Sequence, residues 1–217
     1  MQLTSSKHFH TIEILTFLLI TIWGVVQGQV TVFYIIYFFW FQLLIGTIID
    51  IVYARKNGEG DGKKPSPALI FGCMFIYFCY LLLIIVFFGV MLNFNNQDLV
   101  IINLRTLLLR NLGFDLNIML FAVQYALYRK QIGNKDLQIA LFDRGHLILH
   151  ISIILGAFIQ MQFVRKHPEY FSVPELWGSA LVVLPFLLLK ILINRKRQKQ
   201  IWKVGSLFLV LIESIKV

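Results

Sequence analysis

Charged residues are scarce in this sequence. They make up 14% of the 217 residues, against about 25% in an ordinary soluble domain. Hydrophobic residues make up 58%, and the mean hydropathy is +0.76. A soluble protein of this length exposes much of its surface to water, so it could not bury so much apolar sequence. The shortage of charge therefore excludes a soluble globular protein and indicates one that lies in a membrane.

Cysteine is scarce too, and the familiar catalytic motifs are absent. Cys73 and Cys79 lie six residues apart within one apolar block, a spacing that suits neither a zinc site nor a redox pair. The sequence contains no GxxxxGK[ST], no GxSxG and no HExxH, the motifs of nucleotide, serine-hydrolase and zinc-protease sites. Whether the protein is an enzyme, and with which cofactor, stays open.

The apolar residues that are present gather into six blocks, each close to the roughly 20 residues that a helix needs to cross a bilayer. We predict an all-α, polytopic transmembrane bundle in residues 1–200, with spans at about 11–26, 30–53, 68–92, 112–128, 144–164 and 175–193. Residues 99–110 carry Arg105 and Arg110, so they form either an interfacial lead-in helix or the start of the fourth span. Residues 201–217 are too short to span, and we predict an amphipathic helix in the interface.

The loop charges predict an orientation. Of 20 Lys and Arg residues, a cytoplasmic N-terminus places fifteen in or beside inside segments and four outside, with Lys190 in the last span. We therefore predict a multi-pass protein of the cell (cytoplasmic) membrane, with both termini in the cytoplasm and anionic lipid bound at the basic tail. Because the membrane accounts for the net charge of +9, we expect no nucleic-acid partner. A homo-oligomer or a membrane partner remains open.

Polar side chains inside spans are costly and often functional, and the fifth span has several. Asp143, His146, His150 and Gln160 fall near one face of a helix. An HxxxH pair can ligate a metal, hold a haem or pass protons, although a metal would need a third ligand from another span. Alternatively, His146 lies at the headgroup level and His150 makes one hydrogen bond to a neighbouring helix.

Three spans together predict a candidate binding site. The second span carries Gln42 and Asp50 on one face, and Arg144, His150 and Lys190 lie in the fifth and sixth. We expect these five side chains to line a site, open toward the cytoplasm, for a small solute, a proton or a lipid headgroup. Arg144 would bind an anionic group, His150 would exchange a proton and Gln42 would orient the ligand. The alternatives are a membrane enzyme with a metal or haem on His146 and His150, and an accessory or structural subunit.

Two segments resemble a known family. The block Arg-Gly-His-Leu-Ile-Leu-His-Ile-Ser-Ile-Ile-Leu-Gly-Ala-Phe, from Arg144 to Phe158, comes before a last span that ends Leu-Leu-Leu-Lys-Ile-Leu-Ile-Asn. Both resemble a widespread prokaryotic family of uncharacterised polytopic integral membrane proteins, a domain of unknown function. Its members have an Arg-x5-His-x5-Gly fifth span and a Lys in the last span.

The resemblance implies a six-helix bundle and singles out Arg144, His150, Gly156 and Lys190, but it supplies no activity. The chain also departs from the family. Gln42 stands where a Glu is expected, Phe39 replaces a Tyr, and the third span lacks the family's His-Tyr-Gly pattern. The missing Glu weakens any mechanism that needs an intramembrane carboxylate–histidine pair.

Overall fold

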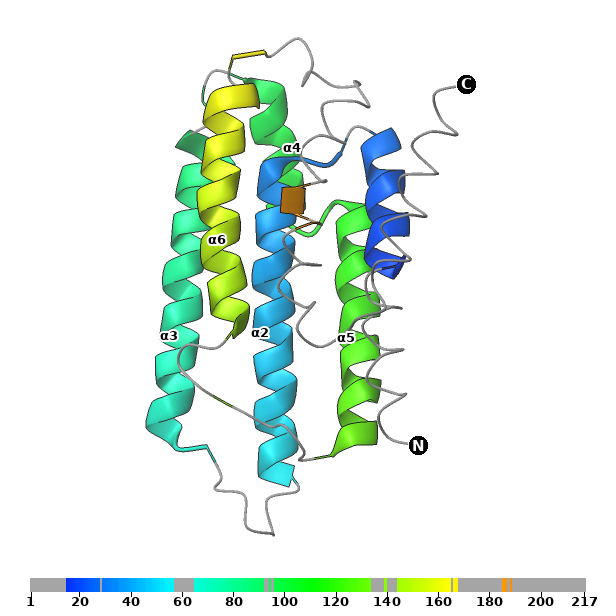
Figure 1. The fold of residues 1–217 in the computed structure, drawn as a ribbon, viewed down its shortest axis with the longest axis vertical. Coiled ribbons are helices and arrows are strands. Elements are labelled where there is room, and N and C mark those ends of the chain that lie inside the picture. Colours follow the sequence, from blue (N-terminus) through cyan, green and yellow to red (C-terminus); the bar gives the residue numbers. More distant parts are fainter. Residues whose placement is uncertain are drawn as a thin grey trace.

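The secondary structure of the described chain is helical throughout (Figure 1). A computed structural model describes residues 15–27, 29–56, 65–91, 94, 96–133, 139, 144–164, 166–167, 185–186 and 188. Its helices are Leu15–Val26, α2 (Val32–Lys56), α3 (Pro67–Leu83), η1 (Ile84–Val90), α4 (Gln97–Leu107), α5 (Leu112–Ile132), α6 (Arg144–Ile159) and η3 (Gln160–Val164). The two η segments are short π-helical ends that continue α3 and α6.

Four helical segments are long and apolar enough to cross a membrane: Val32–Lys56, Pro67–Val90, Gln97–Gln131 and Gly145–Val164. The third of these takes in both α4 and α5. The protein is therefore an all-helical, multi-pass membrane protein. The helix Leu15–Val26 is apolar but shorter. Most of the predicted sixth span, 175–193, and all of the predicted interfacial helix, 201–217, lie outside the described residues, as do both termini.

Helix α2 lies at the centre of the bundle. In Figure 1 it stands between α5 on one side and the pair α3 and α6 on the other, and it packs against all three. Every residue from Val32 to Trp40 is buried, and most of these side chains are large and apolar. Aromatic rings fill the core around α2, where Phe114 of α5 contacts four aromatic side chains: Tyr34, Tyr37, Phe38 and Phe41.

Helices α2 and α5 run in the same direction. Asn117 contacts Tyr34 near the start of both helices, and Tyr125 contacts Asp50 further along both. We call the end of the bundle at which these two helices finish the basic end, because their last turns carry Arg55, Lys56, Arg129 and Lys130. The charge rule predicts that this end faces the cytoplasm.

Residues 99–110 include most of α4, a separate helix that packs against α2 and η1. The buried amide of Asn103 donates to the carbonyl oxygens of Phe88 and Gly89, at 3.3 and 3.4 Å, and accepts a 2.7 Å hydrogen bond from the Thr31 hydroxyl. The Asn111 side chain then accepts from the Phe114 amide and caps the N-terminus of α5. Polar side chains thus fix α4 to the bundle, while the fourth span proper begins at α5.

Candidate functional site

Helix α6 begins well inside the bundle. His146, the third residue of α6, stacks on Tyr77, the eleventh residue of α3, with ring centroids 5.1 Å apart. The difference of eight residues, at a rise of about 1.5 Å each, sets the start of α6 about 12 Å further from the basic end than the start of α3. Figure 1 shows the same offset, since α2, α3 and α5 all extend beyond the lower end of α6. The N-terminus of α6 therefore lies at depth, beside apolar helices.

Two histidines and two tyrosines form a cluster between α3 and α6. We call Tyr77, Tyr80, His146 and His150 the histidine–tyrosine cluster. The Tyr80 hydroxyl lies 2.5 Å from Nδ1 of His150 and 3.2 Å from its Nε2, and Nδ1 is also 3.3 Å from the His146 carbonyl oxygen. The His146 ring is buried and the His150 ring is exposed at the bundle surface. The cluster therefore runs from the interior to the outer face of α3 and α6.

Tyr77 connects this cluster to α2. Its hydroxyl lies 2.7 Å from the Thr47 hydroxyl and 3.5 Å from the Leu43 carbonyl oxygen. Its own carbonyl accepts a 2.8 Å hydrogen bond from the indole N–H of Trp40. A buried hydroxyl needs such partners, because an unmade hydrogen bond in an apolar environment is expensive. The contacts hold the Tyr77 ring, and with it His146, in one position.

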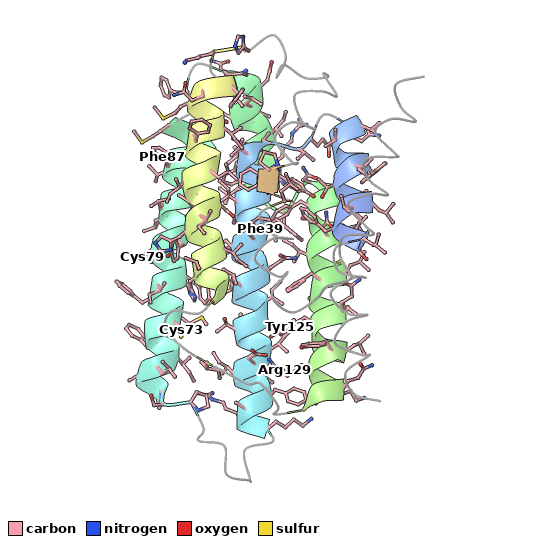
Figure 2. The ribbon with its side chains drawn as sticks, in the orientation of Figure 1. Phe39, Cys73, Cys79, Phe87, Tyr125 and Arg129 are labelled. Atoms are coloured by element: carbon pink, nitrogen blue, oxygen red, sulfur yellow. The ribbon has the colours of Figure 1, made fainter. Side chains whose placement is uncertain are left out.

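A second polar cluster joins α2 to α5. The Arg129 guanidinium makes a 2.7 Å ion pair with Asp50, and both side chains are largely buried. The Tyr125 hydroxyl lies 3.0 and 3.1 Å from the two carboxylate oxygens of Asp50, and it also accepts a 3.2 Å bond from Arg129. We call these three residues the Asp50–Arg129 cluster. Figure 2 shows Tyr125 and Arg129 on α5, toward the basic end.

Of the predicted site residues, His150 lies in the histidine–tyrosine cluster and Asp50 in the Asp50–Arg129 cluster. Arg144 is the first residue of α6, and Gln42 is half-buried on α2, two turns before Asp50. The contacts of His150 are with Tyr80 and α6, whereas Asp50 contacts Tyr125 and Arg129. His150 and Asp50 therefore belong to different clusters, on opposite sides of α2. Lys190 and Asp143 lie outside the described residues.

A metal or haem on His146 and His150 requires a further ligand from another span. Within the described residues, no group of three or more His, Cys, Asp or Glu side chains could hold a metal ion. Cys73 and Cys79 both lie on α3, the first buried and the second exposed. The third ligand that this hypothesis requires is thus not found in that part of the chain.

The sequence alone does not single out four residues of these clusters: Tyr77, Tyr80, Tyr125 and Arg129. Tyr77 and Tyr80 share a helix face at a spacing of three, a signal that was available but looks the same as aromatic packing. The fourth span predicted from the sequence ends at residue 128, which places Arg129 in a cytoplasmic loop. Helix α5 continues to Ile132, and this extra turn carries Arg129 into contact with α2.

A family model matches residues 1–208, nearly the full length of the chain, and its description is a family of unknown function, DUF6498. The chain belongs to the DUF6498 family. The prediction of an uncharacterised family of this kind is thereby confirmed. No curated protein and no solved structure matches the chain. Membership in DUF6498 brings no activity with it, so the function has to be argued from the two clusters.

Proposed function

We propose that this membrane protein holds a polar site at the start of α6, where an anionic group binds beside Arg144 and His150 exchanges a proton. The anionic group belongs to a small solute or a lipid headgroup. The observation that supports the proposal is the depth of the α6 N-terminus. The first four amides of a helix have no partner within the helix, and together with the helix dipole they attract anions. In this proposal the positive charge of Arg144 attracts the same anionic group.

His150 is the residue for proton exchange in this proposal. A neutral imidazole donates one hydrogen bond and accepts another, and it gains a proton near neutral pH. The contact of His150 with the Tyr80 hydroxyl holds the ring on α6, whose rise of about 1.5 Å per residue places His150 about 9 Å along the helix from Arg144. Tyr80 is therefore a positioning residue. The exposure of His150 gives the ring a route to a proton or headgroup from outside the bundle.

The other predicted residues have supporting roles. Gln42 orients the ligand from α2, and Lys190 supplies a second cation from the last span. Asp50 contributes by holding α2 against α5 through Arg129, which keeps the framework of the site rigid. A charge inside a span is costly unless it is paired, and Arg129 is the partner of Asp50.

Anion binding tests the proposal directly. The probes are inorganic phosphate, acetate and glycerol 3-phosphate, added to the purified full-length protein while its thermal unfolding midpoint is measured. We expect at least one probe to raise the midpoint of the wild type, because a ligand that binds only the folded state stabilises it. Arg144→Gln and His150→Phe should abolish the increase.

Arg55→Gln is the matched control. Arg55 is an exposed arginine in the last turn of α2 at the basic end, so its loss lowers the overall charge as much as the loss of Arg144 does. The control should retain the wild-type increase. Equal increases in Arg144→Gln and wild type would show nonspecific charge screening and would contradict the proposed site.

A further inference from the structure

The junction between α4 and α5 contains a helix cap with an unusual residue. After α4 ends at Leu107, Leu109 adopts a left-handed backbone conformation with φ of 53°. The Arg110 amide donates to the Arg105 carbonyl at 2.8 Å, and the Leu109 amide donates to the Thr106 carbonyl at 3.1 Å. These two bonds define a Schellman motif, in which the left-handed position is usually glycine. Leucine is strained there because its Cβ crowds the backbone.

The cap brings two arginines together. In a Schellman motif, the residues at the positions of Arg105 and Arg110 lie next to each other. In many helix caps these two residues are apolar and pack together. Here both side chains are exposed cations, and like charges at close range repel. The C-terminus of α4 favours one cation, but Arg110 also precedes the N-terminus of α5, where a cation is unfavourable.

No acidic residue in the described chain neutralises this pair. Asp98 lies in the first turn of α4 and Asp115 in the first turn of α5. Neither forms an ion pair with Arg105 or Arg110, and within the described residues no side-chain hydrogen bond reaches either guanidinium. The strained cap thus holds two adjacent positive charges that lack a counter-charge among the described residues.

On the outer surface of the bundle, apolar side chains surround Arg105 and Arg110. Asn103 and Thr106 face inward and are buried, whereas the leucines of the corner are about half exposed or more. These leucines are Leu104, Leu108, Leu109 and Leu112, and Met91 and Phe94 are exposed as well. Exposed apolar side chains beside arginines are typical of a surface that contacts both the acyl chains and the headgroups of lipids. A free anion in water would not need these exposed apolar side chains.

We propose that Arg105 and Arg110 bind the phosphate of an anionic phospholipid, in the leaflet at the end of the bundle opposite the basic end. Planar guanidinium groups bind phosphate oxygens in pairs, and two of them around one phosphate remove the repulsion between the arginines. The leucines of the corner contact the acyl chains of the same lipid. This site is separate from the one at α6 and does not depend on it.

Native mass spectrometry of the full chain, released from micelles that contain phosphatidylglycerol, tests the proposal. The wild type should keep a bound phosphatidylglycerol. In the double variant Arg105→Gln with Arg110→Gln, the fraction of protein with bound lipid should fall at least tenfold. Lys166→Gln is the control, because Lys166 is an exposed cation beyond η3 at the same end and contacts only Gln162 among the described residues. It should retain the lipid.

A second variant separates binding from folding. Arg105→Lys with Arg110→Lys keeps the charge but loses the paired guanidinium bonds, so we expect intermediate lipid occupancy in a folded protein. Equal occupancy in the Gln variant and the wild type would overturn the proposal. So would displacement of the lipid by inorganic phosphate at low concentration, which would show a free-anion site. Loss of a dimer instead of a lipid would show that the corner binds a second copy.

Discussion

At the scale of single residues, the buried Asp50–Arg129 ion pair gives the clearest prediction for stability. A buried charge without its partner is expensive, and removal of one member of such a pair costs about 3–5 kcal/mol. We therefore predict that Asp50→Ala and Arg129→Ala each lower the free energy of unfolding by about 3 kcal/mol in a lipid-like micelle. The double variant should lose less than the sum of the two single losses.

The measurement is a double-mutant cycle by equilibrium unfolding. Lys130→Ala is a suitable control, since Lys130 is the exposed neighbour of Arg129 on α5. Strictly additive losses in the cycle would mean that the ion pair does not couple α2 to α5.

Gly156 gives a second prediction at this scale. A Cβ at Gly156 would clash with Cδ1 of Ile36, and it would meet Cγ1 of Val32 at 3.1 Å and Cε1 of Phe88 at 3.2 Å. Because three side chains crowd the position, Gly156→Ala should destabilise the protein by about 1 kcal/mol and Gly156→Leu by about 3 kcal/mol.

Gly46 is the internal comparison for Gly156. A Cβ there would meet only Tyr125, at 3.7 Å or more, and alanine is the better helix former by about 1 kcal/mol. Gly46→Ala should thus be neutral or stabilising in the same unfolding assay. The opposite order of the two alanine variants would refute this account of helix packing.

At the scale of elements, the cap of α4 carries strain that a single substitution should release. Leu109 has a left-handed backbone, which costs an ordinary residue about 1 kcal/mol and glycine very little. Leu109→Gly should therefore stabilise the isolated protein by about 1 kcal/mol, and Leu109→Val should destabilise it, as measured by the unfolding midpoint. An unchanged midpoint in both variants would show that the cap is not strained.

The element scale also shows what the sequence could and could not predict. Long apolar runs fixed the positions of α2, α3 and α6 to within a few residues, because a span must match the bilayer. Hydropathy does not decide the boundary between α4 and α5, because this boundary depends on the left-handed Leu109 and the Asn111 cap. Neither a leucine in that conformation nor the inward turn of Asn103 has a signature in hydropathy.

The candidate site was only partly accessible to sequence reasoning for a similar reason. Helical spacing placed His146 and His150 on one face, and their contacts with Tyr77 and Tyr80 agree with that face. Which helix packs against this face of α6 depends on the tertiary structure, and helical spacing does not predict it. The partners on α3 therefore could not be predicted. The pairing of Asp50 with Arg129 was missed because a cation near a span end is usually assigned to the loop.

At the scale of the whole molecule, the orientation in the membrane is the next prediction. The charge bias places the basic end in the cytoplasm. In a version without native cysteines, Lys56→Cys should react with a membrane-impermeant maleimide only after the cells are permeabilised. Lys166→Cys, at the opposite end, should react in intact cells. The reverse labelling pattern would show that the topology is inverted, and it would leave the description of the bundle unchanged.

The central claim is that His150 exchanges a proton beside an anion site at the start of α6. The most direct measurement is the ¹⁵N spectrum of the histidine side chains in lipid nanodiscs, recorded with and without inorganic phosphate. His150→Gln identifies the signal, and His167, exposed beyond η3, serves as the reference histidine. We predict that inorganic phosphate shifts the His150 signal in the wild type but not in Arg144→Gln. A His150 signal that does not respond to phosphate in the wild type, or that responds equally without Arg144, would contradict the account.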